Sequence, residues 1–150
     1  MKTICVIGLG YIGLPTSVLL ASSGYRVFGI DINEEIVKKV NSGEAHISEP
    51  KLDYLLKKTV NQERLSAHKK PLEADIFIIA VPTPFKQNKT QNELPKPNLD
   101  YVLQAAKSIK EVINPGNLVI LESTSPVGTT KKVSEIIFPE KSKDSDKIYF

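Results

Sequence analysis

The sequence predicts an α/β protein of the Rossmann type, a doubly wound parallel sheet with helices on both faces. Three observations lead to this prediction. Apolar runs typical of buried strands alternate with helix-like stretches along the chain. A glycine-rich turn, Gly8-x-Gly10-x-x-Gly13, joins the first run to the first helix. An acid, Asp31, ends the second run at about the ~20-residue spacing that dinucleotide-binding folds use.

The elements follow one another as such a sheet requires, in one domain that takes in residues 1–150. Strands are predicted at residues 3–8, 26–31, 65–68, 75–81 and 117–121, and a sixth begins at 147–150. Helices are predicted at 12–23, at 33–42 with Asn33 as the cap, from Ser48–Pro50 through Val60, at 99–113 and at 129–138. The expected strand order is 3-2-1-4-5-6.

Composition and charge exclude several classes of function. The chain has 150 residues, of which 41% are hydrophobic and 25% charged, as in a soluble globular domain. The net charge of +3 is small and the lysines are dispersed, so no nucleic-acid partner is expected. No signal peptide or membrane span is expected. The one cysteine, Cys5, is expected to fill the core, and its presence as a free thiol favours a reducing, cytoplasmic location.

Two further features have weaker interpretations. His46 and His68 lack the spacing of metal ligands, so no metal site is expected and both are predicted to lie at the surface. The connection Pro82–Pro97 is long and leaves the end of the fourth strand where ligands bind. It is expected to act as a lid beside the ligand, or else to be a flexible insertion. The stretch 141–147 is expected to be a polar turn.

The glycine motif predicts a binding site for the pyrophosphate of a dinucleotide. Gly8 allows a sharp turn, Gly10 lets a phosphate approach the backbone, and Gly13 lets the helix pack on the strand. The N–H groups and the dipole at the start of the helix favour an anion there. A purely structural strand–turn–helix with an aspartate cap is the alternative explanation.

The end of the second strand favours NAD as the cofactor. The Asp31 carboxylate would accept hydrogen bonds from the adenosine ribose and repel a 2′-phosphate. Residues 32–35 are Ile, Asn, Glu and Glu, so no arginine is present there to receive that phosphate. NADP is therefore disfavoured, whereas FAD uses a similar fingerprint and is not excluded by the motif alone.

Three segments together resemble the NAD-binding domain of the UDP-glucose/GDP-mannose dehydrogenase family. They are Gly8–Thr16 (GLGYIGLPT), Ala80–Phe85 (AVPTPF) and Glu122–Gly128 (ESTSPVG), and each follows a predicted strand. The residues in these segments are most similar to those of the branch that oxidises UDP-N-acetylated hexosamines such as UDP-N-acetylmannosamine. The resemblance extends from residue 3 to about residue 138.

The resemblance implies an activity and a set of partners. The family oxidises the C6 alcohol of a nucleotide sugar to a carboxylate with two NAD⁺ in succession, for surface polysaccharides, and a cysteine captures the intermediate aldehyde. That cysteine, a lysine, an asparagine, the dimerising helix and the UDP-binding domain lie beyond this domain in the family. This chain alone is therefore expected to bind NAD weakly and to be inactive. A homodimer or larger assembly is expected for the full-length enzyme, with a monomer allowed for this chain alone.

The resemblance also implies a role for each residue that matches a family motif. The cofactor-binding residues would be Gly8, Gly10 and Gly13, the amides of Tyr11 and Ile12, Asp31 on the ribose, Val81, Pro82 and Thr83 along the cofactor, and Ser123 and Thr124 near the nicotinamide. Thr124 is the candidate catalytic residue, since the family threonine positions a water or polar group. Alternatively, Thr124 simply caps the following helix.

Departures and alternatives remain open from the sequence. Ile36 stands where many relatives have a basic residue near the adenosine, so that contact is missing or replaced. Glu122 is a weak candidate site residue, and Glu49–Pro50 matches a family pair that helix-start chemistry explains equally well. The alternatives are a UDP-glucose or UDP-N-acetylglucosamine 6-dehydrogenase, a β-hydroxyacid dehydrogenase with a similar glycine motif, and a stand-alone, non-catalytic NAD-binding module.

Overall fold

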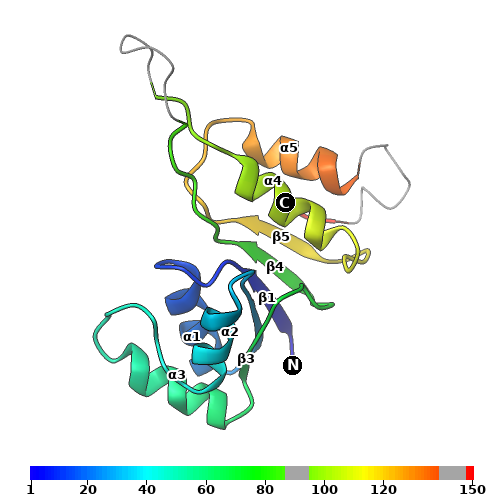
Figure 1. Ribbon diagram of the computed structural model, residues 1–150. Helices are drawn as coiled ribbons and strands as arrows, with labels where there is room; N and C mark the ends of the chain where they lie inside the picture. The colour runs from blue at the N-terminus through cyan, green and yellow to red at the C-terminus, as the bar shows by residue number, and fades with distance from the viewer. Residues whose placement is uncertain (87–94, 139–147) are drawn as a thin grey trace.

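The computed structural model describes residues 1–86, 95–138 and 148–150. It has a five-stranded parallel sheet in the order β3-β2-β1-β4-β5, with helices on both faces (Figure 1). The strands are β1 (Thr3–Ile7), β2 (Arg26–Ile30), β3 (Leu65–His68), β4 (Ile76–Ile79) and β5 (Leu118–Leu121). The helices are α1 (Gly13–Ser22), α2 (Glu34–Asn41), α3 (Leu52–Asn61), α4 (Asp100–Ile109) and α5 (Thr129–Ile137). The predicted fold class and the order of the first five strands are confirmed.

The predicted sixth strand is represented by one bridge. Tyr149 pairs in parallel with Leu118. The Val119 amide donates to the Tyr149 carbonyl at 2.7 Å, and the Tyr149 amide donates to the Asn117 carbonyl at 3.1 Å. The segment therefore lies beside β5, where the predicted order puts it. Lys147 and the predicted turn at 141–147 lie outside the described residues.

The alternation of side chains along β1 divides the core into two layers. Ile4 and Val6 pack with α1, α2 and α3 on one face of the sheet. Cys5 and Ile7 point to the other face, where α4 and α5 cover β4 and β5. Burial raises the pKa of the Cys5 thiol to about 11, so Cys5 fills the core as predicted.

Two helix bounds differ from the prediction for local physical reasons. The helix predicted to open at Ser48–Pro50 begins instead at Leu52, because Lys51 adopts a left-handed conformation with φ of 64°. The helix predicted to reach Ile113 ends at Ile109. Val112 and Ile113 continue its apolar pattern and pack against the core, but from turns rather than from helix.

The edge strand β3 is covered by a side chain from α2. The Asn41 Nδ2 donates to the Ala67 carbonyl at 2.9 Å, and the Ala67 amide donates to the Asn41 Oδ1 at 2.8 Å. One amide side chain thus supplies the pair of hydrogen bonds that a neighbouring strand would supply. Such cover protects an exposed sheet edge from pairing with other chains.

The prediction that both histidines lie at the surface holds only in part, since both are half-buried. His68 Nε2 lies 2.9 Å from Ser66 Oγ, and its ring packs edge-on against Phe28. Nδ1 of His46 is buried with no hydrogen-bond partner in the described part of the chain. In the same part, no group of three or more His, Cys, Asp or Glu residues could hold a metal ion, and no helix is long and apolar enough to cross a membrane.

Candidate dinucleotide site

The loop between β1 and α1 is packed so closely that two of its glycines are required by the protein itself. Gly8 has φ of +96°, and a Cβ there would lie 2.7 Å from the Ala80 carbonyl oxygen. A Cβ on Gly13 would collide with the Gly8 carbonyl oxygen. The first turn of α1 is thereby pressed onto the ends of β1 and β4, as the sequence predicts for Gly8 and Gly13.

Gly10 differs from its two neighbours because no described atom lies within 4 Å of the Cβ it lacks. The amides of Gly10, Tyr11 and Ile12 donate to no acceptor among the residues that the structure describes. The cap residue of α1, Ile12, makes no side-chain capping bond, and it is 58% exposed. The start of α1 is therefore an open group of N–H donors, which fits an anion such as a pyrophosphate.

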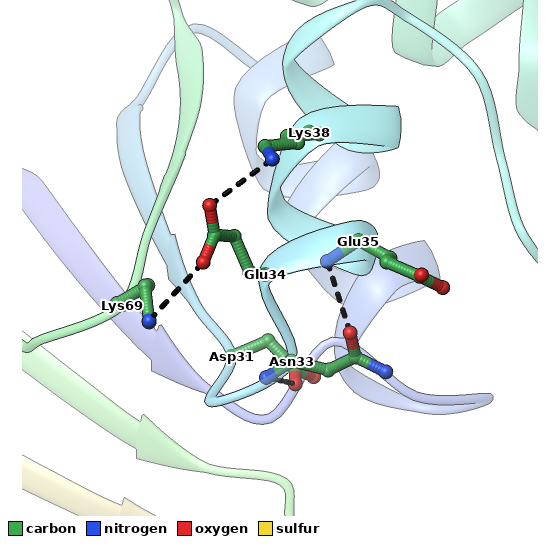
Figure 2. Close-up of polar contacts among 6 residues, drawn as sticks. All are labelled: Asp31, Asn33, Glu34, Glu35, Lys38 and Lys69. Atoms are coloured by element: carbon green, nitrogen blue, oxygen red, sulfur yellow. Dashed lines mark hydrogen bonds and ion pairs between the residues drawn. The ribbon is translucent and has the colours of Figure 1, made fainter.

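Asp31 lies directly after β2, where two main-chain amides hold its carboxylate. Figure 2 shows the contact with the Asn33 amide. Its Oδ2 accepts from the Leu9 amide at 3.1 Å, and its Oδ1 accepts from the Asn33 amide at 2.9 Å. A carboxylate has about four acceptor positions, so two remain for ribose hydroxyls. The cap of α2 is Asn33, whose Oδ1 accepts from the Glu35 amide at 2.9 Å, so the alternative of an aspartate cap does not hold.

The charges near Asp31 are balanced in a way that favours NAD over NADP. Figure 2 shows Glu34 between two lysines, with Oε1 3.1 Å from Lys38 Nζ and Oε2 3.5 Å from Lys69 Nζ. The pKa of the Glu34 carboxyl is held below its usual range, mainly by Lys38 and to a smaller extent by Lys69. Both lysines are exposed and pair with Glu34, and the acids Glu34 and Glu35 beside Asp31 disfavour a 2′-phosphate. Ile36 packs against the core, so this position supplies no polar group to the adenosine, as the sequence predicts.

The ends of β4 and β5 are tied together by Ser123. Its Oγ donates to the Val81 carbonyl at 2.8 Å and lies 3.2 Å from the Ile79 carbonyl. The Glu122 and Ser123 amides also donate to the Ile79 carbonyl, at 3.0 and 3.1 Å. Ser123 therefore supports the segment that follows Val81, which contains Pro82 and Thr83.

Thr124 is exposed at the same edge of the sheet. It lines a hollow of about 200 Å³ with Thr83, Phe85, Pro97, Ser125 and Pro126. The alternative that Thr124 caps the next helix is wrong, because α5 begins at Thr129 with Gly128 as its cap. The Thr124 side chain is therefore available to a ligand or to another part of the protein.

The two described ends of the long connection Pro82–Pro97 pair with each other. Phe85 and Pro97 form an antiparallel bridge, and the Lys86 amide donates to the Lys96 carbonyl at 2.7 Å. Residues 87–94 lie outside the described residues, so the lid predicted for this connection is untested there.

One contact was not anticipated from the sequence. Thr16 Oγ1 on α1 donates to Glu122 Oε1 after β5 at 3.2 Å. Glu122 was only a weak candidate, and Thr16 had no assigned role. Both residues belong to the motif segments at the carboxyl edge of the sheet, which is the signal that could have paired them.

The fold, the open glycine loop and the acid after β2 define a Rossmann dinucleotide-binding domain. The profile of the NAD-binding domain of the UDP-glucose/GDP-mannose dehydrogenase family matches residues 2–150. The chain belongs to this family as its NAD-binding domain, with NAD as the cofactor, and not to the β-hydroxyacid dehydrogenases.

The relatives of this chain are nucleotide-sugar dehydrogenases. The UDP-N-acetyl-D-mannosamine dehydrogenase of Campylobacter jejuni is 53% identical over 139 residues, which cover 93% of this chain and 33% of the relative. The NDP-N-acetyl-D-galactosaminuronic acid dehydrogenase of Ralstonia nicotianae is 50% identical over 134 residues, which cover 89% and 30%. The UDP-N-acetyl-mannosamine dehydrogenase structure from Staphylococcus aureus has 34% identity and a TM-score of 0.85, covering 98% and 35%. The chain spans about a third of the length of these relatives.

Proposed function

We propose that the protein carrying this domain oxidises the C6 alcohol of UDP-N-acetylmannosamine to the uronate with NAD⁺. The observation that carries the proposal is the meeting of three motif segments at one edge of the sheet. Gly8 packs against Ala80, and Ser123 donates to the Val81 carbonyl. The identity of about 50% to relatives named for this activity supports the choice of sugar.

Each reaction cycle balances as an alcohol, two NAD⁺ and one water giving a carboxylate, two NADH and three protons. NAD⁺, when bound, supplies the hydride acceptor for both oxidation steps. Gly8, Gly10 and Gly13 with the Tyr11 and Ile12 amides hold the pyrophosphate, and Asp31 holds the adenosine ribose. Val81, Pro82 and Thr83 lie along the cofactor, and Ser123 and Thr124 lie near the nicotinamide. Thr124 also orients a water or a polar group of the substrate.

Cys5 is not the nucleophile in this proposal. It is buried in the sheet, and burial raises the pKa of its thiol to about 11, so little thiolate forms near neutrality. Capture of the aldehyde is assigned to a residue outside positions 1–150. Residues 1–150 alone are therefore expected to bind NAD⁺ without turning over a sugar. We place the reaction in the cytoplasm and expect a homodimer or larger assembly of the full-length protein.

The test is to supply the full-length protein with NAD⁺ and UDP-N-acetylmannosamine and to measure NADH and uronate together. Two NADH per uronate are expected. UDP-N-acetylgalactosamine is the second candidate, because the Ralstonia relative is almost as similar, and UDP-glucose and UDP-N-acetylglucosamine complete the panel. Preference for another sugar would overturn the choice of substrate. NAD⁺ binding without oxidation of any sugar would favour a non-catalytic module.

A further inference from the structure

The start of α1 contacts the second half of the sheet at two points. The first is the close packing of Gly13, whose missing Cβ would lie 3.2 Å from Ala80 Cβ. The second lies further along α1, where Thr16 Oγ1 donates to Glu122 Oε1 at 3.2 Å. The second contact joins side chains that are 106 positions apart in the sequence.

The Thr16–Glu122 contact connects the two functional segments rather than the core. Glu122 is exposed and Thr16 is half-buried, and neither belongs to the two core clusters. The Glu122 amide is fixed to the Ile79 carbonyl at 3.0 Å, and Ser123 and Thr124 follow directly. The Glu122 side chain therefore links the segment that contains Thr124 to α1, and a change of either Thr16 or Glu122 removes that link.

We infer that Thr16 and Glu122 are positioning residues that set the spacing between the two halves of the dinucleotide site. The inference rests on the proposed roles of the glycine loop and of Thr124. NAD⁺ spans both halves of such a sheet, with its pyrophosphate at the start of α1. An error in the spacing of the two halves would thus lower the affinity for a ligand that must reach both of them. ADP ends at the pyrophosphate and should not detect the same error.

The test compares NAD⁺ and ADP by calorimetric titration of variants of the full-length protein. Thr16→Val removes the donor and Glu122→Leu removes the acceptor, whereas Thr16→Ser and Glu122→Gln keep the hydrogen bond. Loss of the Thr16–Glu122 hydrogen bond is expected to weaken the binding of NAD⁺ by about five-fold, which corresponds to one ordinary hydrogen bond. ADP affinity should stay unchanged, the conservative variants should match the wild type, and the double variant should be no weaker than either single variant.

Glu111→Leu is the matched control, because it removes an exposed carboxylate from the turn after α4. The inference is overturned if Thr16→Val and Glu122→Leu leave NAD⁺ affinity unchanged, or if ADP affinity falls as much as NAD⁺ affinity. It is also overturned if the losses of NAD⁺ affinity in the two single variants add up in the double variant. A wild type that binds neither ligand would overturn the dinucleotide site and this inference together. A wild type that binds both but oxidises no UDP-sugar would overturn the proposed activity alone, and the comparison of variants would still decide the spacing role.

Discussion

The two halves of the carboxyl edge are built differently. At the ends of β1 and β2, main-chain contacts fix the acid and the start of α1: the Asp31 carboxylate accepts from the Leu9 and Asn33 amides, and Gly13 is pressed against Gly8. At the ends of β4 and β5, the Thr124 side chain is exposed at an open hollow lined by Phe85 and other residues.

This difference matches the two tasks of the site. The pyrophosphate and the adenosine ribose are constant parts of the cofactor, and a rigid backbone can be shaped for them before they arrive. The reacting end must accommodate both the nicotinamide and a sugar, and its exposed side chains leave room for groups from elsewhere. We therefore expect the first half to supply most of the cofactor affinity, and the second half to add a smaller part of that affinity and to control the rate of oxidation.

The largest effect is expected from the pair Gly13→Ala and Gly10→Ala, which separates folding from binding. The added methyl on Gly13 meets the Gly8 carbonyl oxygen, so the free energy of unfolding should fall by about 3 kcal/mol. The methyl on Gly10 meets only open space, so stability should change by less than about 0.5 kcal/mol while NAD⁺ affinity falls. Urea denaturation and calorimetry measure the two quantities. Equal stability of the two variants would contradict the packing account.

A smaller loss of stability is expected from Asn41→Ala at the edge of β3. This change removes both hydrogen bonds to Ala67 and should lower the free energy of unfolding by about 1 to 3 kcal/mol. Asn41→Asp places a carboxylate oxygen opposite the Ala67 carbonyl oxygen, so it should be at least as destabilised as Asn41→Ala. NAD⁺ affinity should be retained in both variants at concentrations where each is folded. A fall in affinity without a fall in stability would show that β3 takes part in binding.

Ser123→Ala should have a still smaller effect on folding. It removes the hydroxyl that donates to the Val81 carbonyl, which costs about 1 kcal/mol of stability. Because the end of β4 is then less firmly held, turnover by the full-length enzyme should fall while ADP affinity is unchanged. Thermal unfolding, steady-state kinetics and an ADP titration measure the three quantities. Weakened ADP binding in Ser123→Ala would contradict the proposed division of roles between the two halves.

The smallest effect is the pH dependence that His68 contributes. Burial lowers the pKa of His68 below its usual 6.5, so the unfolded chain binds a proton at a higher pH than the folded one. Its contribution is complete above about pH 6.5 and is lost as the pH falls through that value toward the lowered pKa. Denaturation between pH 7.5 and 5 should show this decline, and His68→Gln should flatten it. An unchanged slope in the variant would assign the decline to other groups.

Much of the first half could be predicted from the sequence because its signals are local. Gly8 and Gly13 are required by turns and contacts within a few residues of the motif, and Asn33 caps the helix that starts at Glu34. Strand β3 has the bounds that the sequence predicts. The alternation of apolar runs and helices predicts a doubly wound parallel sheet, and the strand order follows from the topology of that fold.

The missed features depend on long-range contacts or on backbone conformation. Asn41 and Ala67 meet only after the chain has folded, so local patterns carry no record of that pair. For Thr16 and Glu122, the motif segments indicate that both lie at the carboxyl edge, but not that their side chains meet. The start of α3 was misplaced because Ser48–Pro50 resembles a helix start, whereas Lys51 adopts a positive φ. The histidines were partly misplaced because burial of a polar ring is decided by its neighbours in space.

The most direct test of the central comparison is a calorimetric titration of Asp31→Ala and Thr124→Val with NAD⁺. The account predicts that Asp31→Ala loses affinity by at least about ten-fold, since it removes a charged acceptor of hydrogen bonds. Thr124→Val should lose turnover in the full-length enzyme, while its NAD⁺ affinity falls by no more than the roughly five-fold of one lost hydrogen bond. Unchanged affinity in Asp31→Ala, or loss of affinity confined to Thr124→Val, would contradict the assignment of binding to the first half.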